Sequence, residues 1–123
     1  MIQLKRAYDG AAAGDGRRIL VERLWPRGVK KTDLPLDAWM KEVAPSTELR
    51  QWFSHDPAKW AEFQKRYVAE LRAHAAALQP LLAAAAAPGK LTLIYSSHDE
   101  EHNNAIVLKR YLEDRLKRKK HAA

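Results

Sequence analysis

The sequence contains no cysteine among its 123 residues. A disulfide framework, a thiolate metal site and a cysteine nucleophile are therefore excluded. Long apolar runs are also missing, because no stretch approaches the roughly 20 uninterrupted apolar residues that span a membrane. The first ten residues lack the apolar core of a signal peptide. We therefore expect a cytoplasmic protein with no membrane partner.

What the sequence does contain is typical of one globular domain, with 46% hydrophobic and 30% charged residues. The formal net charge is +7, but five of these charges come from the last nine residues and leave +2 for the rest of the chain. The five residues are Arg115, Lys117, Arg118, Lys119 and Lys120. We interpret residues 1–116 as a single α/β domain and residues 117–123 as a basic tail. Such a run most often ends a solvated helix, and nucleic-acid binding is the alternative.

Three segments have the pattern of strands. Residues 2–8 alternate apolar and basic side chains, and a second strand is expected to begin at about Arg18 and to be stopped by Pro26. The third segment, LTLIYSS at residues 91–97, is rich in β-branched and aromatic residues. Helical patterns separate the last two strands, which favours a parallel unit. The predicted fold is a single small α/β domain with a mostly parallel sheet flanked by helices.

The helical region covers residues 34–82. A short helix is expected to carry Trp39 and Val43 and to end at Pro45. Farther along, the alanine-rich segment is expected to be helical with an interruption at Pro80.

Two positions within this region have the signature of helix N-caps. Ser46 precedes a short apolar pattern, and Asp56 is followed by Pro57, which suits the first helical position. Behind this second cap, apolar residues recur at helical spacing and predict one buried stripe. The stripe consists of Trp60, Phe63, Tyr67 and Leu71.

A polar cluster follows the third strand and precedes an amphipathic helix. Ser97 stands three residues before Glu100, a spacing that predicts a capping box at the helix start. In open α/β folds, ligands bind at the carboxyl ends of strands, so this junction is also where a site is expected. The remaining polar residues of the junction are His98, Asp99, Glu101, His102, Asn103 and Asn104.

Three roles stay open for the junction. His98 and His102 are four residues apart and, with a carboxylate such as Glu101, have the chemistry of a metal site, although their spacing does not fit the zinc-protease helix. His102, oriented by Asp99 or Glu101, has the chemistry of a general acid or base. The plainest role is that these histidines bind their neighbours at a helix start. The pattern specifies neither a cofactor nor an oligomeric state.

Arginines end the second strand and complete a predicted pocket. Arg23 and Arg27 would face the junction if the two strands are neighbours, which would place anion-binding cations beside proton-transfer groups. An ion pair between Glu22 and a neighbour such as Arg23 is the equally weighted structural alternative. Trp25 is the tryptophan expected to line a pocket. A second polar corner, with Ser46, Arg50 and His55, either joins the same cleft or consists of caps.

Three motifs, RILVERLWPRG, LDAWMKEVAPSTELRQWFSHDP and YSSHDEEHNNA, together resemble the YeaO-like family of uncharacterised bacterial and archaeal proteins, a branch of a larger domain-of-unknown-function family. The likeness extends from about residue 2 to about residue 116. It implies a small cytoplasmic α/β protein and brings no established substrate. Glu22 stands where the family commonly has aspartate. More distant branches look as if they use a cysteine after the last strand, and a thiol mechanism does not carry over to this chain.

The leading hypothesis is a pocket at the strand ends that binds a small anionic or polar ligand, with a hydrolase-like or transferase-like activity as an extension. His102, Asp99 and Glu101 are the predicted catalytic residues. The predicted ligand-binding residues are Glu22, Arg23, Trp25, Arg27, Ser46, Arg50, His55, Asn103 and Asn104. The alternative is a nucleic-acid-binding or regulatory protein that uses its basic tail, although the glycine-containing turn of a helix-turn-helix is missing.

Overall fold

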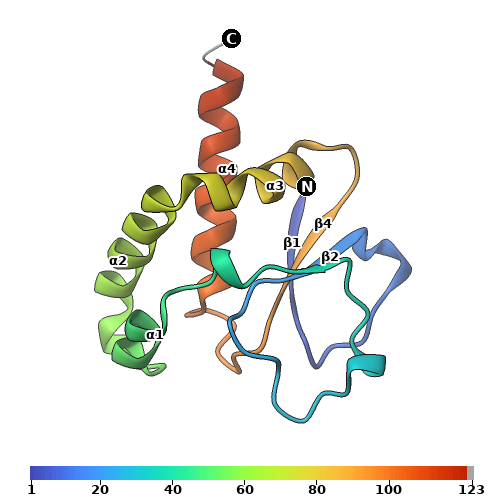
Figure 1. Ribbon diagram of the computed structural model, residues 1–123, viewed down its shortest axis with the longest axis horizontal. Helices are drawn as coiled ribbons and strands as arrows, with labels where there is room; N and C mark the ends of the chain where they lie inside the picture. The colour runs from blue at the N-terminus through green and yellow to red at the C-terminus, as the bar shows by residue number, and fades with distance from the viewer. Residues whose placement is uncertain (122–123) are drawn as a thin grey trace.

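A four-stranded parallel sheet forms the centre of the molecule (Figure 1). The computed structural model describes residues 1–121. The strands lie in the order β1-β4-β2-β3, and every neighbouring pair is parallel. Their bounds are β1 Ile2–Arg6, β2 Arg17–Leu20, β3 Ala38–Trp39 and β4 Leu91–Tyr95. The predicted α/β fold and its parallel sheet are confirmed.

Four α-helices lie together on one side of the sheet, and the loops around β3 lie on the other (Figure 1). The helices are α1 Thr47–Phe53, α2 Trp60–Ala73, α3 Ala75–Ala86 and α4 Asn104–His121. Short 3-10 turns occur at Ala13–Asp15, Lys31–Asp33, Lys41–Val43 and Pro57–Lys59. Within the described part of the chain, no helix is long and apolar enough to cross a membrane.

The two faces of the sheet have separate cores because side chains alternate along a strand. Every residue of β4 is buried, including the polar Thr92, which is the pattern of a strand covered on both faces. Leu93 and Tyr95 pack with the helices, where the predicted stripe residues Phe63, Tyr67 and Leu71 are buried. Ile94 and Leu20 face the other way and pack under the chain that follows β2. The helices and this segment thus enclose the carboxyl ends of β2 and β4.

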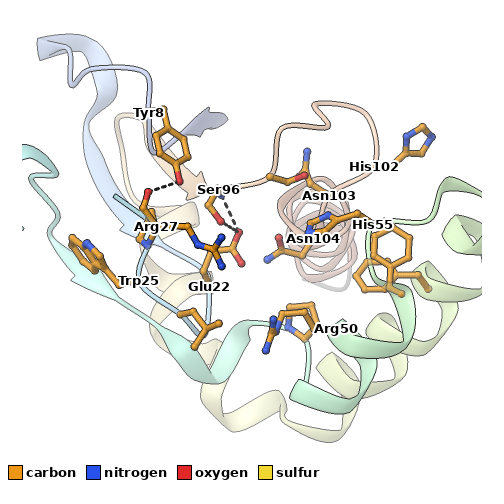
Figure 2. A pocket seen from close by; sticks show the side chains of 16 residues that line it. Tyr8, Glu22, Trp25, Arg27, Arg50, His55, Ser96, His102, Asn103 and Asn104 are labelled. Carbon is orange, nitrogen blue, oxygen red and sulfur yellow. Dashed lines mark hydrogen bonds between the residues drawn. The ribbon is translucent and has the colours of Figure 1, made fainter. Parts of the chain in front are cut away.

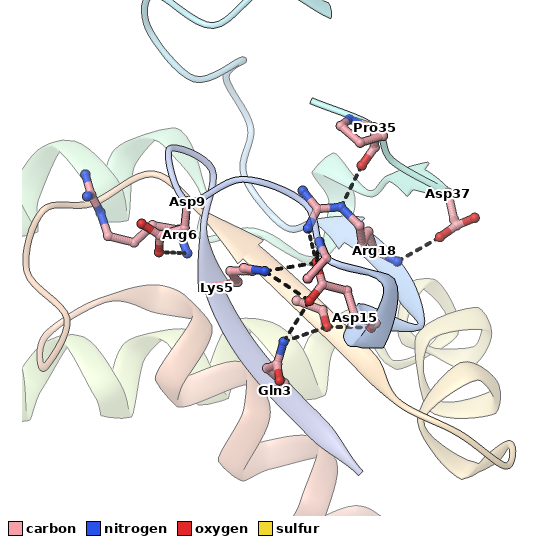
Figure 3. Close-up of polar contacts among 10 residues, drawn as sticks. Gln3, Lys5, Arg6, Asp9, Asp15, Arg18, Pro35 and Asp37 are labelled. Carbon is pink, nitrogen blue, oxygen red and sulfur yellow. Dashed lines mark hydrogen bonds and ion pairs between the residues drawn. The ribbon is translucent and has the colours of Figure 1, made fainter. Parts of the chain in front are cut away.

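A polar cluster ties three strands together on the second face (Figure 3). Asp15 is 3% exposed and accepts hydrogen bonds from Lys5 Nζ of β1 at 3.1 Å and from Arg18 Nη1 of β2 at 2.5 Å. Thr92 of β4 donates to the Asp15 carbonyl at 2.6 Å. The Ala12 amide, followed by Lys5 and Arg18, holds the pKa of Asp15 well below its usual range. The cluster therefore connects β1 and β2 through the Asp15 carboxylate and β4 through the Asp15 backbone carbonyl.

The prediction of a short helix around Trp39 is wrong. The Met40 amide donates to the Leu20 carbonyl at 2.9 Å and the Asp37 amide to the Arg18 carbonyl at 2.7 Å, so this segment pairs with β2 as a strand. The Trp39 indole donates to the Glu22 carbonyl at 2.6 Å. Pairing with a neighbouring strand therefore overrides the helical spacing, and Val43 belongs to a 3-10 turn instead.

The predicted interruption at Pro80 is also wrong. Pro80 lies inside α3, and the break falls at His74, between α2 and α3. His74 has φ −114° and ψ 38°, outside the helical region, and its amide closes α2 by donating to the carbonyls of Glu70 and Leu71. Pro80 is exposed and removes a single helical hydrogen bond, which the packing of α3 on α4 outweighs.

Candidate functional site

A cavity of about 320 Å³ lies where β2 and β4 end, between the segment that follows β2, helix α1 and the start of α4 (Figure 2). This is the edge of the sheet at which a site was predicted. Its walls are formed by Tyr8, Glu22, Leu24, Trp25, Pro26, Arg27, Pro45, Arg50, Phe53, His55, Phe63, Ser96, Ser97, His102, Asn103 and Asn104.

The cavity brings together eight of the twelve predicted site residues. These are Glu22, Trp25, Arg27, Arg50, His55, His102, Asn103 and Asn104. Arg23 and Ser46 line a separate cavity of about 80 Å³ instead, and Asp99 and Glu101 belong to neither wall. The sequence reasoning missed Tyr8, Ser96 and Ser97. All three follow strand ends of a parallel sheet, so the rule that located the junction would also have found them.

Glu22 is the carboxylate at the bottom of the cavity. Its Oε1 accepts the Ser96 amide at 3.0 Å and the Ser96 hydroxyl at 3.4 Å (Figure 2). Burial raises the pKa of Glu22, while the Ser96 bonds and the charge of Arg50 act in the opposite direction. The bond to Ser96 therefore connects the ends of β2 and β4 and fixes the carboxylate in the cavity.

Arg23 does not reach this cavity. Its Nε donates to the Pro45 carbonyl at 2.7 Å, and its side chain lines the smaller cavity beside Glu42 and Glu70. Arg23 therefore contacts the backbone at Pro45 instead of pairing with Glu22, and it does not line the predicted pocket. Consecutive residues after a strand project to opposite sides, so Glu22 and Arg23 diverge.

Arg50 enters the cavity from α1, opposite Tyr8 (Figure 2). Its Nε is buried and has no hydrogen-bond partner among the described residues. The helix that carries it is firmly placed. Ser46 caps α1, as predicted, by accepting from the Leu49 amide at 3.1 Å, and its hydroxyl donates to Glu70 of α2 at 2.5 Å. Arg50 is thus a cation with an unused donor, carried on a helix that Ser46 anchors.

Arg27 supplies the second cation. Its backbone carbonyl accepts the Tyr8 hydroxyl at 2.9 Å, and its side chain extends toward Glu22 (Figure 2). Nearby, the Trp25 indole donates to the Val29 carbonyl at 2.6 Å and packs edge-on against Trp39. These contacts hold the loop after β2, which carries Arg27, against the sheet. The backbone of Arg27, like that of Arg50, is therefore held in place beside the cavity.

The predicted capping box at the start of α4 is wrong. Ser97 accepts from the Asp99 amide at 3.1 Å, and Asp99 Oδ1 accepts from the His102 amide at 2.9 Å. Asn103 Oδ1 then accepts from the Ile106 amide at 3.1 Å and caps a helix that begins at Asn104. The chain therefore makes two side-chain-stabilised turns before the helix starts, because short polar side chains compete for these amides.

The two histidines of the junction do not face one way, contrary to the spacing argument. Nδ1 of His98 lies 3.0 Å from Nη2 of Arg6, and the His98 ring stacks on Tyr8. His102 binds Asp99 Oδ2 through its own Nδ1 at 2.9 Å. They point apart because both precede α4 and lie on a loop rather than on one helical turn. Across the described residues, no group of three His, Cys, Asp or Glu side chains is placed to hold a metal ion.

His102 has an orienting carboxylate and a position at the cavity edge. The Glu101 amide, followed by His102, lowers the pKa of Asp99. The ring meets Trp60 edge-on at 5.2 Å, and Figure 2 shows it away from Glu22 and Arg27. The Asp99–His102 pair therefore resembles a proton-transfer pair in its bonding, while Glu22 and the arginines lie on the far wall.

The two asparagines support the walls. Asn103 Nδ2 donates to the Asp99 carbonyl at 3.0 Å, and Asn104 Nδ2 donates to the Val21 carbonyl at 2.8 Å. Both residues are buried. Their side chains fix the start of α4 to its own loop and to the end of β2. Groups on the cavity wall that could contact a ligand include the two arginines, the second oxygen of Glu22 and the imidazoles of His55 and His102.

The basic tail continues α4 as far as His121. Just before the tail, Arg115 Nη1 donates to the Tyr111 hydroxyl at 3.0 Å, and within the tail Arg118 pairs with Asp114 at 3.2 Å. Residues 122 and 123, and the side chains of Lys119, Lys120 and His121, lie outside the described part of the structure. The described cations fit a solvated helix end.

Comparison with known proteins identifies relatives along the whole chain. The family model described as the inactive DUF488-N3 subclade matches residues 1–123. "Uncharacterized protein YeaO" from Escherichia coli is 50% identical over 111 residues, which cover 90% of this chain and 96% of the relative. "Uncharacterized protein Rv3073c" from Mycobacterium tuberculosis is 44% identical over 75 residues, or 61% of this chain and 64% of the relative. No solved structure matches the chain.

The chain therefore belongs to the inactive DUF488-N3 subclade, and the resemblance to YeaO-like proteins is confirmed.

Proposed function

We propose that this DUF488-family protein binds a small anionic ligand in the cavity at the ends of β2 and β4, and that Arg50 and Arg27 are its anion-binding groups. The observation that carries the proposal is the buried Arg50 Nε–H, which has no partner in the described protein. An unpaired buried donor is costly, and a charged one costs more than a neutral one. An anion would satisfy this donor through a charge-assisted hydrogen bond.

The remaining chemistry of the cavity supports a ligand with polar substituents. Glu22 uses Oε1 for Ser96, which leaves Oε2 to accept from a ligand hydroxyl or amine. Phe53, Phe63 and Trp25 supply apolar wall. A volume of about 320 Å³ suits a compact small molecule.

Binding without turnover is the form of the proposal that the observations favour. The matching subclade is described as inactive. In addition, the His102 ring stands at the cavity edge, and Asp99 contacts the ring but not the cavity. A hydrolase-like or transferase-like activity based on His102, Asp99 and Glu101 is the alternative. It requires that His102→Ala abolish turnover of a bound ligand, whereas a binding protein has no turnover to lose.

The test is calorimetric titration of the protein with inorganic phosphate, sulfate and small carboxylates, with thermal unfolding as a second readout. Ligand at 100 times its Kd stabilises the native state by about 2.7 kcal/mol. Arg50→Gln should raise the Kd by about tenfold or more, because a hydrogen bond to a charged group contributes about 1.5–3 kcal/mol. Arg72→Gln removes the same charge from an exposed site on α2 outside the cavity walls and should leave the Kd unchanged.

Equal affinity of the Arg50 and Arg72 variants would refute the proposal. Nucleic-acid binding through the basic tail, the alternative predicted from sequence, gives a different pattern. It requires an affinity for short DNA that falls steeply with salt and with removal of residues 117–123, and that is indifferent to Arg50→Gln. A pocket ligand should be unaffected by this truncation.

A further inference from the structure

Glu22 has one bonded and one free oxygen. Oε1 accepts from both the amide and the hydroxyl of Ser96, whereas Oε2 makes no hydrogen bond within the described residues. Among the buried side-chain polar atoms of those residues, Arg50 Nε is the one without a partner. Oε2 is therefore not sealed inside the protein, and it opens to the cavity that Glu22 lines. The cavity thus contains an unpaired acceptor in addition to the unpaired donor of Arg50.

The Ser96 amide fixes which oxygen of Glu22 is free. A backbone N–H only donates, so the atom that faces it at 3.0 Å must be an acceptor. Ser96 follows β4 and Glu22 follows β2, so this bond joins two neighbouring strands and holds the carboxylate in place. An ionised carboxylate accepts and does not donate. Oε2 therefore requires a hydrogen-bond donor from any ligand that reaches it.

The charges around the cavity define the rest of the ligand. The charge of Arg50 acts to lower the pKa of Glu22, so the guanidinium and the carboxylate lie near enough to contact one ligand. Arg27 adds a second cation, and its side chain extends toward Glu22 (Figure 2). A second anionic group on the ligand would be repelled by the carboxylate, and an ammonium group would meet both arginines. An uncharged donor such as a hydroxyl avoids both penalties.

We infer that Glu22 determines the specificity of the anion site and that the ligand is a hydroxylated anion, whose negative group binds Arg50 and whose hydroxyl donates to Glu22 Oε2. A small hydroxycarboxylate has this chemistry. The cavity, at about 320 Å³, has room for both groups. The inference rests on the proposed function, because it adds a second contact to the same anion site.

Three monocarboxylates separate the two contacts. Glycolate has a hydroxyl that donates and accepts, methoxyacetate has an ether oxygen that only accepts, and acetate has neither. Each is titrated into isotopically labelled protein and followed by NMR chemical shifts. Because burial raises the pKa of Glu22, the titrations are run at about pH 8 to keep the carboxylate ionised. The wild-type protein should bind glycolate about tenfold more tightly than acetate, and methoxyacetate no more tightly than acetate.

Glu22→Gln changes the free position from an acceptor to a donor. The Ser96 amide requires the amide oxygen of the glutamine, so the NH₂ group takes the place of Oε2. The lost negative charge should tighten the binding of all three anions alike. The glycolate preference over methoxyacetate, about tenfold in the wild-type protein, should fall close to one, because the NH₂ group donates to either oxygen.

Two control variants should keep the preference for glycolate. Glu48→Gln removes the same charge from an exposed site on α1 outside the cavity walls, and it should leave all three affinities unchanged. Arg50→Gln should weaken the binding of all three anions by the same factor, because each of them uses its carboxylate there.

Equal affinity of the wild-type protein for glycolate, methoxyacetate and acetate overturns the inference and leaves the Arg50 site standing. A preference for glycolate that persists in Glu22→Gln also overturns it, since the methyl group of methoxyacetate would then explain the difference. A protein that binds none of the three carboxylates overturns it as well. The phosphate and sulfate titrations then decide separately whether the proposed function survives.

Discussion

Tyr67→Phe tests how α2 supports the helix that carries Arg50, the main residue of the proposed anion site. Tyr67 lies in the middle of α2, its side chain is fully buried, and its hydroxyl donates to the Val43 carbonyl at 2.5 Å. Burial raises the pKa of Tyr67, so the hydroxyl remains a proton donor at every pH at which the protein is handled. Val43 lies three residues before Ser46, the cap of α1. This single bond therefore anchors the chain that leads into the helix of Arg50.

The substitution removes the donor and keeps the ring. Because Val43 is only 1% exposed, water cannot easily replace the lost hydroxyl, and a buried acceptor left without its partner costs about 1–3 kcal/mol. For a chain of this length, that loss lowers the Tm by roughly 5–12 °C. The measurement is urea unfolding followed by tryptophan fluorescence, with thermal unfolding by circular dichroism alongside. The slope of the urea transition should stay constant, since the exposed surface does not change.

Tyr111→Phe provides the matched control. Tyr111 is also buried, at 8% exposure, but its hydroxyl bonds to Arg115, whose guanidinium reaches water readily. This variant should lose no more than about 0.5 kcal/mol. If both variants lose the same free energy within about 0.5 kcal/mol, the Val43 carbonyl does not depend on Tyr67 and the reasoning fails.

Three further substitutions probe other parts of the fold. Gly16→Ala should cost more than about 2 kcal/mol in urea unfolding, because Gly16 has φ +64° and a Cβ would lie 2.0 Å from the Lys90 carbonyl oxygen. Ser46→Ala should cost about 1 kcal/mol in thermal unfolding through the lost α1 cap, whereas Thr47→Ala, one residue on and exposed, should be nearly neutral. Glu22 has a pKa raised above 4.5 in the native state, so its contribution to stability is complete below about pH 4.5 and is lost as the pH rises through the folded pKa. Glu22→Gln should therefore flatten this part of the pH profile and increase stability at pH 7, and a lower stability at pH 7 would contradict the assignment.

Local chemistry made much of the fold predictable from the sequence. The buried strand β4 and the caps at Ser46 and Asp56 depend on short-range patterns, and the structure contains all three. The segment around Trp39 was mispredicted because its structure depends on hydrogen bonds to β2, some twenty residues earlier. The capping box at Ser97 was mispredicted because Asp99 and Asn103 accept the amides first. Errors thus arose where distant pairing or competing acceptors decide the outcome.

The position of the cavity was predictable from the sequence, whereas the directions of the side chains around it were not. Parallel strands place their carboxyl ends at one edge, so the region around Glu22 and the junction after β4 had to meet once the two strands were neighbours. No comparable rule predicts from the sequence in which direction a single side chain points once the strand has ended. Arg23 projects to the Pro45 carbonyl and away from the cavity. Arg50 lines the cavity instead, although the sequence did not decide whether its segment joins the cleft or only caps helices.

The hydrogen bonds that the polar residues of the cavity already make explain why we expect its ligand to be an anion. The side-chain amides of Asn103 and Asn104 both donate to backbone carbonyls, and one oxygen of Glu22 accepts from Ser96. These bonds fix the wall but leave few donors for a ligand. Among the described residues, the buried side-chain donor that has no partner belongs to Arg50. Because the unpaired buried donor of the cavity belongs to a cation and Arg27 adds a second, we expect the cavity to prefer a ligand that carries negative charge, whether or not any bond of the ligand is broken there.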